Sequence, residues 1–120
     1  LLYGFGQGGS GETFRGLEAL AREHADVATV QVVYATALDQ LDRGDEAFAI
    51  VERLAAADDA ARLDVWSVRY AARALARRGR LPEALRLIGR RVERETGPKA
   101  RAALVRVAAD LYEELPEHKD

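Results

Sequence analysis

The sequence predicts an all-α fold, a right-handed superhelix of about three antiparallel helix pairs. Three similar segments open with Glu12, Glu46 and Glu83, so the repeat spacing is 34 and then 37 residues. A period in the mid-thirties is typical of helical repeats, which bury their apolar faces only by stacking on neighbours. Apolar residues also recur at helical spacing from Val27 to Leu111, and short glycine-containing turns interrupt them.

The first expected helix begins near Glu12 and ends near His24. The second begins near Val27, and we expect Gly44 to terminate it. Its β-branched start, residues 27–35, favours a strand locally, but we expect helix stacking to override that preference. The residues expected to face inward on this helix are Val30, Tyr34, Ala37, Leu38 and Leu41.

Asp45 is expected to cap the third helix, which fades at residues 57–59. The fourth helix runs over residues 63–78 and stops at Gly79. The inward residues of these two helices share the same spacing, and they are Ala47, Phe48, Val51 and Leu54, then Val68, Ala71, Ala72 and Leu75.

Pro82 lies where the first turn of a fifth helix tolerates proline, and this helix ends at Thr96 and Gly97. Pro98 begins the last long helix. The inward residues of this pair are Ala84, Leu85, Ile88 and Val92, then Leu104, Val107, Ala108 and Leu111. Residues 115–117 repeat residues 81–83, so we expect one domain over residues 1–120 that is cut in mid-repeat at both ends. Its exposed ends are expected to favour self-association.

The pattern resembles the tetratricopeptide repeat (TPR) family. The first helix of each pair carries small residues at its middle positions, such as Ala37, Ala71 and Ala108, which allow close helix approach. Residues 79–85 resemble the turn between the two helices of that family, whereas the turn before Ala47 is two residues shorter. The resemblance implies antiparallel helix pairs whose first helices line a concave groove that binds peptides or partner proteins.

Composition excludes several function classes. The chain has 120 residues, a net charge of −2, 48% hydrophobic residues and no cysteine, which removes disulfides and thiolate zinc sites. No apolar run is long enough to span a membrane and no signal-like start is present, so we expect a cytoplasmic protein. The two histidines, His24 and His118, lie in segments without ligand spacing, so we expect no metal, no cofactor and no enzymatic activity.

The predicted function is therefore protein–protein interaction, as a scaffold or adaptor segment of a longer polypeptide. One alternative is a regulatory helical region of a larger signalling or transcription-control protein. Another is a degenerate P-loop nucleotide-binding module, because residues 1–13 read as strand, glycine-rich loop and helix start. That pattern requires a lysine where Glu12 stands, and a carboxylate there repels phosphate.

Four residues form the candidate binding site on the fourth helix. Trp66, Arg69, Arg73 and Arg77 share one face, where arginine forks bind carboxylates and tryptophan supplies an apolar or cation–π wall. We therefore expect an acidic or carboxylate-ended protein segment as the partner. A solvated face of an arginine-rich chain gives the same pattern.

Asp39 and Asp42 are expected on the same groove wall, where pairing with the arginines would make the stripe structural. A nucleic-acid partner is not favoured, because aromatic residues are not interleaved with the cations.

Overall fold

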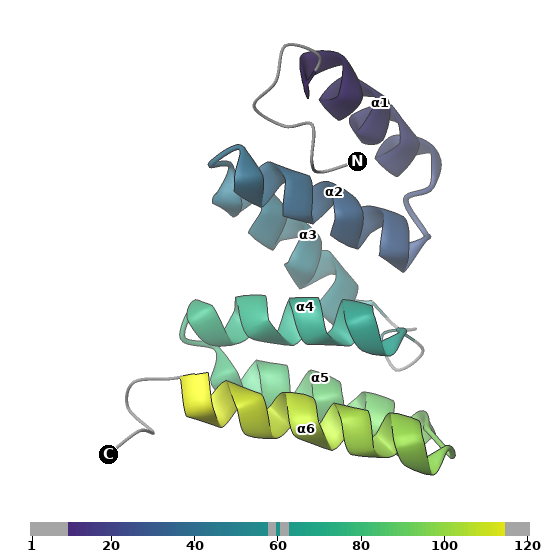
Figure 1. The fold of residues 1–120 in the computed structure, drawn as a ribbon, viewed down its shortest axis with the longest axis vertical. Helices are drawn as coiled ribbons and strands as arrows, with labels where there is room; N and C mark the ends of the chain where they lie inside the picture. Colours follow the sequence, from purple (N-terminus) through teal and green to yellow (C-terminus); the bar gives the residue numbers. More distant parts are fainter. Residues whose placement is uncertain (1–9, 58–59, 61–62, 115–120) are drawn as a thin grey trace. The chain divides into compact units, whose positions relative to one another are not determined.

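The computed structural model describes residues 10–57, 60 and 63–114, and every regular element among them is an α-helix. The six helices follow each other through short connections (Figure 1), and their bounds are α1 Ser10–Glu23, α2 Ala28–Gln40, α3 Gly44–Ala56, α4 Val65–Arg77, α5 Leu81–Arg94 and α6 Pro98–Glu114. The all-α prediction is confirmed. Most of the strand and glycine-rich loop that the nucleotide-binding alternative requires, at residues 1–9, and the repeat start at residues 115–117 lie outside the described residues.

The chain divides into two compact units, with the boundary inside α3 between Val51 and Glu52. Each unit is built from helices that pack antiparallel against their sequence neighbours: α1 against α2 in the first, and α4, α5 and α6 against one another in the second. One domain over residues 1–120, and a right-handed superhelix, therefore stay predictions.

In the first unit, α1 and α2 pack through Leu17 and Ala21 on one side and Val32, Ala35 and Leu38 on the other, all of them buried. Residues 28–35 are helical, as predicted, with Val27 in the extended backbone position just before the helix. Burial of this apolar face outweighs the local strand preference of the β-branched residues.

One polar side chain lies within this packing. Gln31 is 6% exposed, and its Nε2 donates to the carbonyls of Ala21 at 2.8 Å and His24 at 3.2 Å. The Ala21 carbonyl lies in the last turn of α1, where no further helical turn satisfies it, and the His24 carbonyl just after α1 also accepts from the Val27 amide at 3.0 Å. Gln31 therefore closes α1, and His24 lies at a helix end as predicted.

The turn between α2 and α3 is made by a different residue from the one predicted. Asp42, with φ of 64°, adopts the left-handed conformation, and the Arg43 amide donates to the Leu38 carbonyl at 2.9 Å. Gly44 does not terminate α2 but begins α3, which places Asp45 in the first turn rather than at the cap. Aspartate tolerates the left-handed region better than most residues, which allows the helix to end at Gln40, four positions before the glycine.

In the second unit, each of α4, α5 and α6 packs against the other two. Asp64 caps α4 by accepting from the Ser67 amide at 3.1 Å and the Ser67 hydroxyl at 2.6 Å. The predicted inward residues Val68, Ala71, Ala72 and Leu75 are all fully buried. Burial of the alanines is consistent with close approach of the neighbouring helices.

The turn from α4 to α5 and the start of α6 follow the sequence interpretation. Gly79 has a φ of 79°, and the Arg80 amide donates to the Leu75 carbonyl at 2.9 Å. Pro82 lies in the first turn of α5 and Pro98 begins α6. One predicted inward residue is wrong: Leu41, just after α2, is 37% exposed.

Candidate binding surfaces

The predicted stripe lies entirely on α4, and its four side chains have different environments. Trp66 is 49% exposed, and Arg69 and Arg77 are also exposed. Arg73 is only partly exposed, because its Nη2 forms a 2.7 Å ion pair with Glu114 of α6. The Nε atom of Arg73 is buried and has no hydrogen-bond partner among the described residues. The stripe therefore contains one arginine that joins two helices.

Arg69 lines a hollow between α4 and α6, which we call the α4–α6 groove. The groove has a volume of about 540 Å³, and its lining residues are Val65, Arg69, Lys99, Ala102, Ala103, Arg106, Val107 and Asp110. Four of these residues are apolar, three are cations and one is a carboxylate. None of the three cations has a carboxylate partner among the residues that the structure describes.

Sequence reasoning missed Lys99 and Arg106, because it followed one helix at a time. Both lie on α6, two helices after α4, which carries Arg69. They line the same groove only because α6 packs against α4. The signal available in the sequence was their spacing of seven residues, which places two cations on one helix face.

Asp39 and Asp42 belong to the first unit, and both are exposed. Asp39 lies in the last turn of α2 and takes part in an interaction there, while Asp42 makes the left-handed turn. Pairing of these aspartates with the arginines of α4 stays a prediction, since the two units are described separately.

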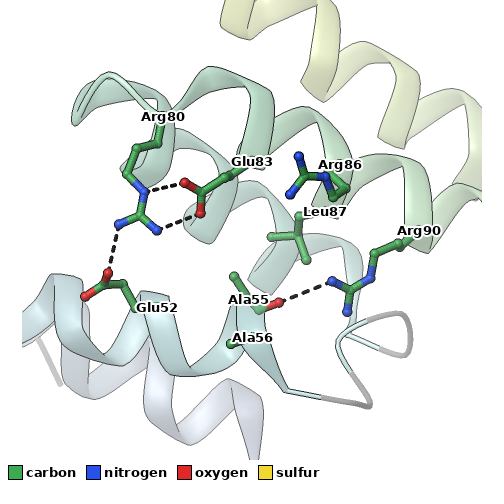
Figure 2. Close-up of a pocket in the computed structure, with 8 residues that line it drawn as sticks. All are labelled: Glu52, Ala55, Ala56, Arg80, Glu83, Arg86, Leu87 and Arg90. Carbon is green, nitrogen blue, oxygen red and sulfur yellow. Dashed lines mark hydrogen bonds and ion pairs between the residues drawn. The ribbon is translucent and has the colours of Figure 1, made fainter.

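A second, polar pocket lies beside α5 in the second unit, with a volume of about 350 Å³ (Figure 2). Arg80 holds one side of it: its Nε and Nη2 donate to the two oxygens of Glu83 at 2.7 and 2.6 Å, and its Nη1 donates to Glu52 at 2.8 Å. These hydrogen bonds raise the pKa of Arg80, and the bond from Arg80 lowers the pKa of the Glu83 carboxyl. Bidentate arginine–carboxylate pairs fix geometry better than single contacts do.

Arg90 closes the other end of this pocket by donating to the carbonyls of Ala55 at 3.4 Å and Ala57 at 3.3 Å, at the end of α3. Arginine at a helix C-terminus satisfies carbonyls that the helix cannot. Arg86, which is exposed, also lines the pocket. Most polar side chains that line this pocket therefore already form hydrogen bonds that hold the helices together.

The first unit contains the same fork 37 residues earlier. Arg43 donates to both oxygens of Glu46 at 2.8 and 2.7 Å, and this bond lowers the pKa of the Glu46 carboxyl. Arg43 also lies over the Phe14 ring, with 5.2 Å from guanidinium carbon to ring centroid. In both units the arginine of the fork comes one position after the left-handed turn residue, and the glutamate comes four positions after it. The two turns are 37 residues apart in the sequence.

No metal centre is formed by the described residues, among which no three histidine, cysteine or acidic side chains gather. None of the described helices is long and apolar enough to cross a membrane. Comparison with protein-family models, with curated proteins and with solved structures finds no significant match to this chain.

Proposed function

We propose that this chain is a protein–protein interaction module of the helical-repeat type, similar to tetratricopeptide repeats, and that it binds an acidic protein segment in the α4–α6 groove. The observation that carries this proposal is the groove itself. The groove is a hollow of about 540 Å³ lined by four apolar residues and by three cations that have no carboxylate partner among the described residues. Such a surface suits an extended peptide with acidic and small apolar side chains.

The repeated turns support the helical-repeat part of the proposal. Asp42 and Gly79 are the left-handed residues of their turns, and each is followed by an arginine that forks onto a glutamate three positions later. Since the two units share this detail of backbone and side chain, they repeat one structural motif. Repeats of this kind commonly present binding surfaces rather than catalytic centres.

The charges of the groove support the acidic partner. Arg69 from α4 and Lys99 and Arg106 from α6 converge on one hollow, whereas Asp110 is its one carboxylate. Trp66, one turn before Arg69 on the predicted stripe, is 49% exposed and offers an aromatic surface on the same helix. Exposed tryptophan and arginine are the residues most enriched among binding hot spots.

The test uses a fluorescein-labelled decapeptide that alternates glutamate and alanine, titrated with the chain and followed by fluorescence anisotropy at low salt. We expect saturable binding that weakens as salt rises, and no binding of the same peptide with lysine in place of glutamate. The Arg69→Gln/Arg106→Gln variant should weaken binding at least about tenfold, since each lost charge-assisted contact contributes roughly 1.5–3 kcal/mol.

The matched control is Arg53→Gln, which removes an exposed arginine from α3, outside the groove. It should bind the peptide like the parent chain. Equal affinity of the parent chain and the groove variant would refute the groove as the binding site, and equal loss in the control would show that only net charge matters.

A further inference from the structure

The Arg73–Glu114 ion pair lies at one end of the α4–α6 groove. Arg69 and Asp110 line the groove, and Arg73 and Glu114 each follow one of them by four residues. Residues four apart share a helix face, and α4 and α6 start at the same end of the second unit (Figure 1). The ion pair is therefore one helical turn beyond the lining residues, on the same faces of the same two helices.

Glu114 satisfies only half of the Arg73 guanidinium. In Arg43 and Arg80, Nε and Nη2 donate to the two oxygens of one glutamate, at distances of 2.6 to 2.8 Å. In Arg73 the Nη2 donates to one oxygen of Glu114 at 2.7 Å, while the buried Nε has no acceptor among the described residues. A buried donor without an acceptor is destabilising, so the pairing of Arg73 is incomplete.

The ion pair is also easily exchanged. The side chains of Arg73 and Glu114 are 33% and 40% exposed, and ion pairs at such positions contribute little to stability and weaken with salt. Glu114 is the last residue of α6, where the helix dipole disfavours a carboxylate, and Glu113 adds a second negative charge in the same turn. Glu114 can therefore leave Arg73 at small cost when another carboxylate takes its place.

We infer that Glu114 is a competitor, built into the chain, of the acidic partner, and that Arg73 is a further binding residue from which the partner displaces it. The inference rests on the proposed binding of an acidic segment in the α4–α6 groove. One carboxylate of that segment takes the place of Glu114 and accepts from both Nε and Nη2 of Arg73. Binding thereby exchanges a single charged contact for a bidentate one, which is stronger.

The spacing of the arginines on α4 suits acidic residues at alternate positions of the partner. Arg69 and Arg73 are four residues apart, which is about 6 Å along the helix axis. On one side of an extended peptide, side chains are two residues and roughly 6.6–6.8 Å apart. The decapeptide that alternates glutamate and alanine therefore presents carboxylates at a spacing that reaches both arginines.

The first test compares the affinity of this labelled decapeptide for two variants of the whole chain. Glu114→Gln frees Arg73 and should tighten binding about three- to tenfold at low salt, because an exposed ion pair and a like-charge repulsion are both lost. Glu113→Gln is the matched control, since it removes the same charge from an exposed neighbouring residue that has no ion pair among the described residues. It should tighten binding less than about twofold. Equal tightening in both variants would overturn the inference, because net charge alone would explain it.

Removing Arg73 supplies a second test. Without this arginine Glu114 has nothing to occupy, so Glu114→Gln in the Arg73→Gln background should change the affinity no more than the Glu113→Gln control does. Arg73→Gln should also weaken binding more in the Glu114→Gln chain than in the parent. Thermal melts by circular dichroism establish that each variant is folded. A full Glu114→Gln effect in the absence of Arg73 would refute the competition.

The displacement of Glu114 has a direct readout in the parent chain. The Nε–Hε signal of Arg73 in a proton–nitrogen correlation spectrum is assigned by its loss in Arg73→Gln. It should shift when the decapeptide is added, and it should also shift in Glu114→Gln without peptide. Saturable binding that leaves this signal unmoved would refute the inference and leave the proposed function standing. An absence of binding to both the parent and Glu114→Gln would refute the two together.

Discussion

Replacing glycine by alanine at two positions of the second unit should have opposite effects on stability. Gly79 has a φ of 79°, and Gly89 lies inside α5. A Cβ atom added at either position meets no atom within 4 Å, so no steric clash separates the two sites. What differs is the backbone conformation alone.

The magnitudes follow from this difference. Alanine in the left-handed region costs about 1–2 kcal/mol, so Gly79→Ala should lower the free energy of unfolding by that amount. Alanine inside a helix is favoured over glycine by roughly 0.5–1 kcal/mol, so Gly89→Ala should raise it. Each 1 kcal/mol corresponds to a shift of roughly 4–8 °C in the melting temperature of a small domain.

The assay is urea and thermal unfolding followed by circular dichroism, with both variants compared with the parent in one buffer. Because both glycines lie in the unit that begins at Glu52, they report on the same transition. Asp42→Gly tests the equivalent turn of the first unit and should be neutral to stabilising, since glycine suits the left-handed conformation best. A neutral or stabilising Gly79→Ala would show that the turn is not left-handed.

Three further changes have defined outcomes. Leu75→Ala removes a fully buried side chain next to α5 and α6, and should lower the free energy of unfolding by about 2–5 kcal/mol in urea titrations; a loss below about 1 kcal/mol would contradict its burial. Gln31→Ala removes the side-chain donor of the Ala21 carbonyl and should cost about 1–3 kcal/mol in the same assay, whereas an unchanged midpoint would mean that water satisfies this carbonyl equally well. The pKa of Glu83 is lowered by its hydrogen bonds from Arg80, so its contribution to stability is present above the ordinary value of 4.5 and is lost as pH falls through the lowered pKa. Glu83→Gln should flatten the fall of the melting temperature below pH 4.5, and an unchanged pH profile would rule out the fork as its cause.

Helix positions were predictable from the sequence because the spacing of apolar residues and the positions of glycine and proline both depend on local structure. Pro82, Gly79 and Pro98 mark boundaries that the structure has at or near those residues. The end of α2 was not predictable in this way. The sequence predicts Gly44 as the stop signal, but α2 ends at Gln40 and its turn uses the left-handed Asp42 instead.

The candidate site was harder to predict, because it requires knowing which helices adjoin. The α4 stripe was visible as a spacing, and one of its residues, Arg69, lines the α4–α6 groove. The pairing of Arg73 with Glu114 joins residues 41 positions apart, and no periodicity within one helix reports on it. The cations of α6 belong to the groove for the same reason, through tertiary packing rather than local pattern.

Arg91 connects three helix junctions of the second unit through one side chain. It donates to the carbonyl of Leu63 just before α4 and pairs with Glu95 at 2.8 Å just after α5, while Glu95 accepts from the Gly97 amide before α6. Fraying of any one of these helix ends therefore breaks contacts that hold the other two. Lysine could not replace this arginine, since a single ammonium cannot reproduce the planar guanidinium that reaches both the Leu63 carbonyl oxygen and the Glu95 carboxylate. The start of α4 and the start of α6 should consequently open together in hydrogen exchange, as one cooperative segment rather than as two independent ends.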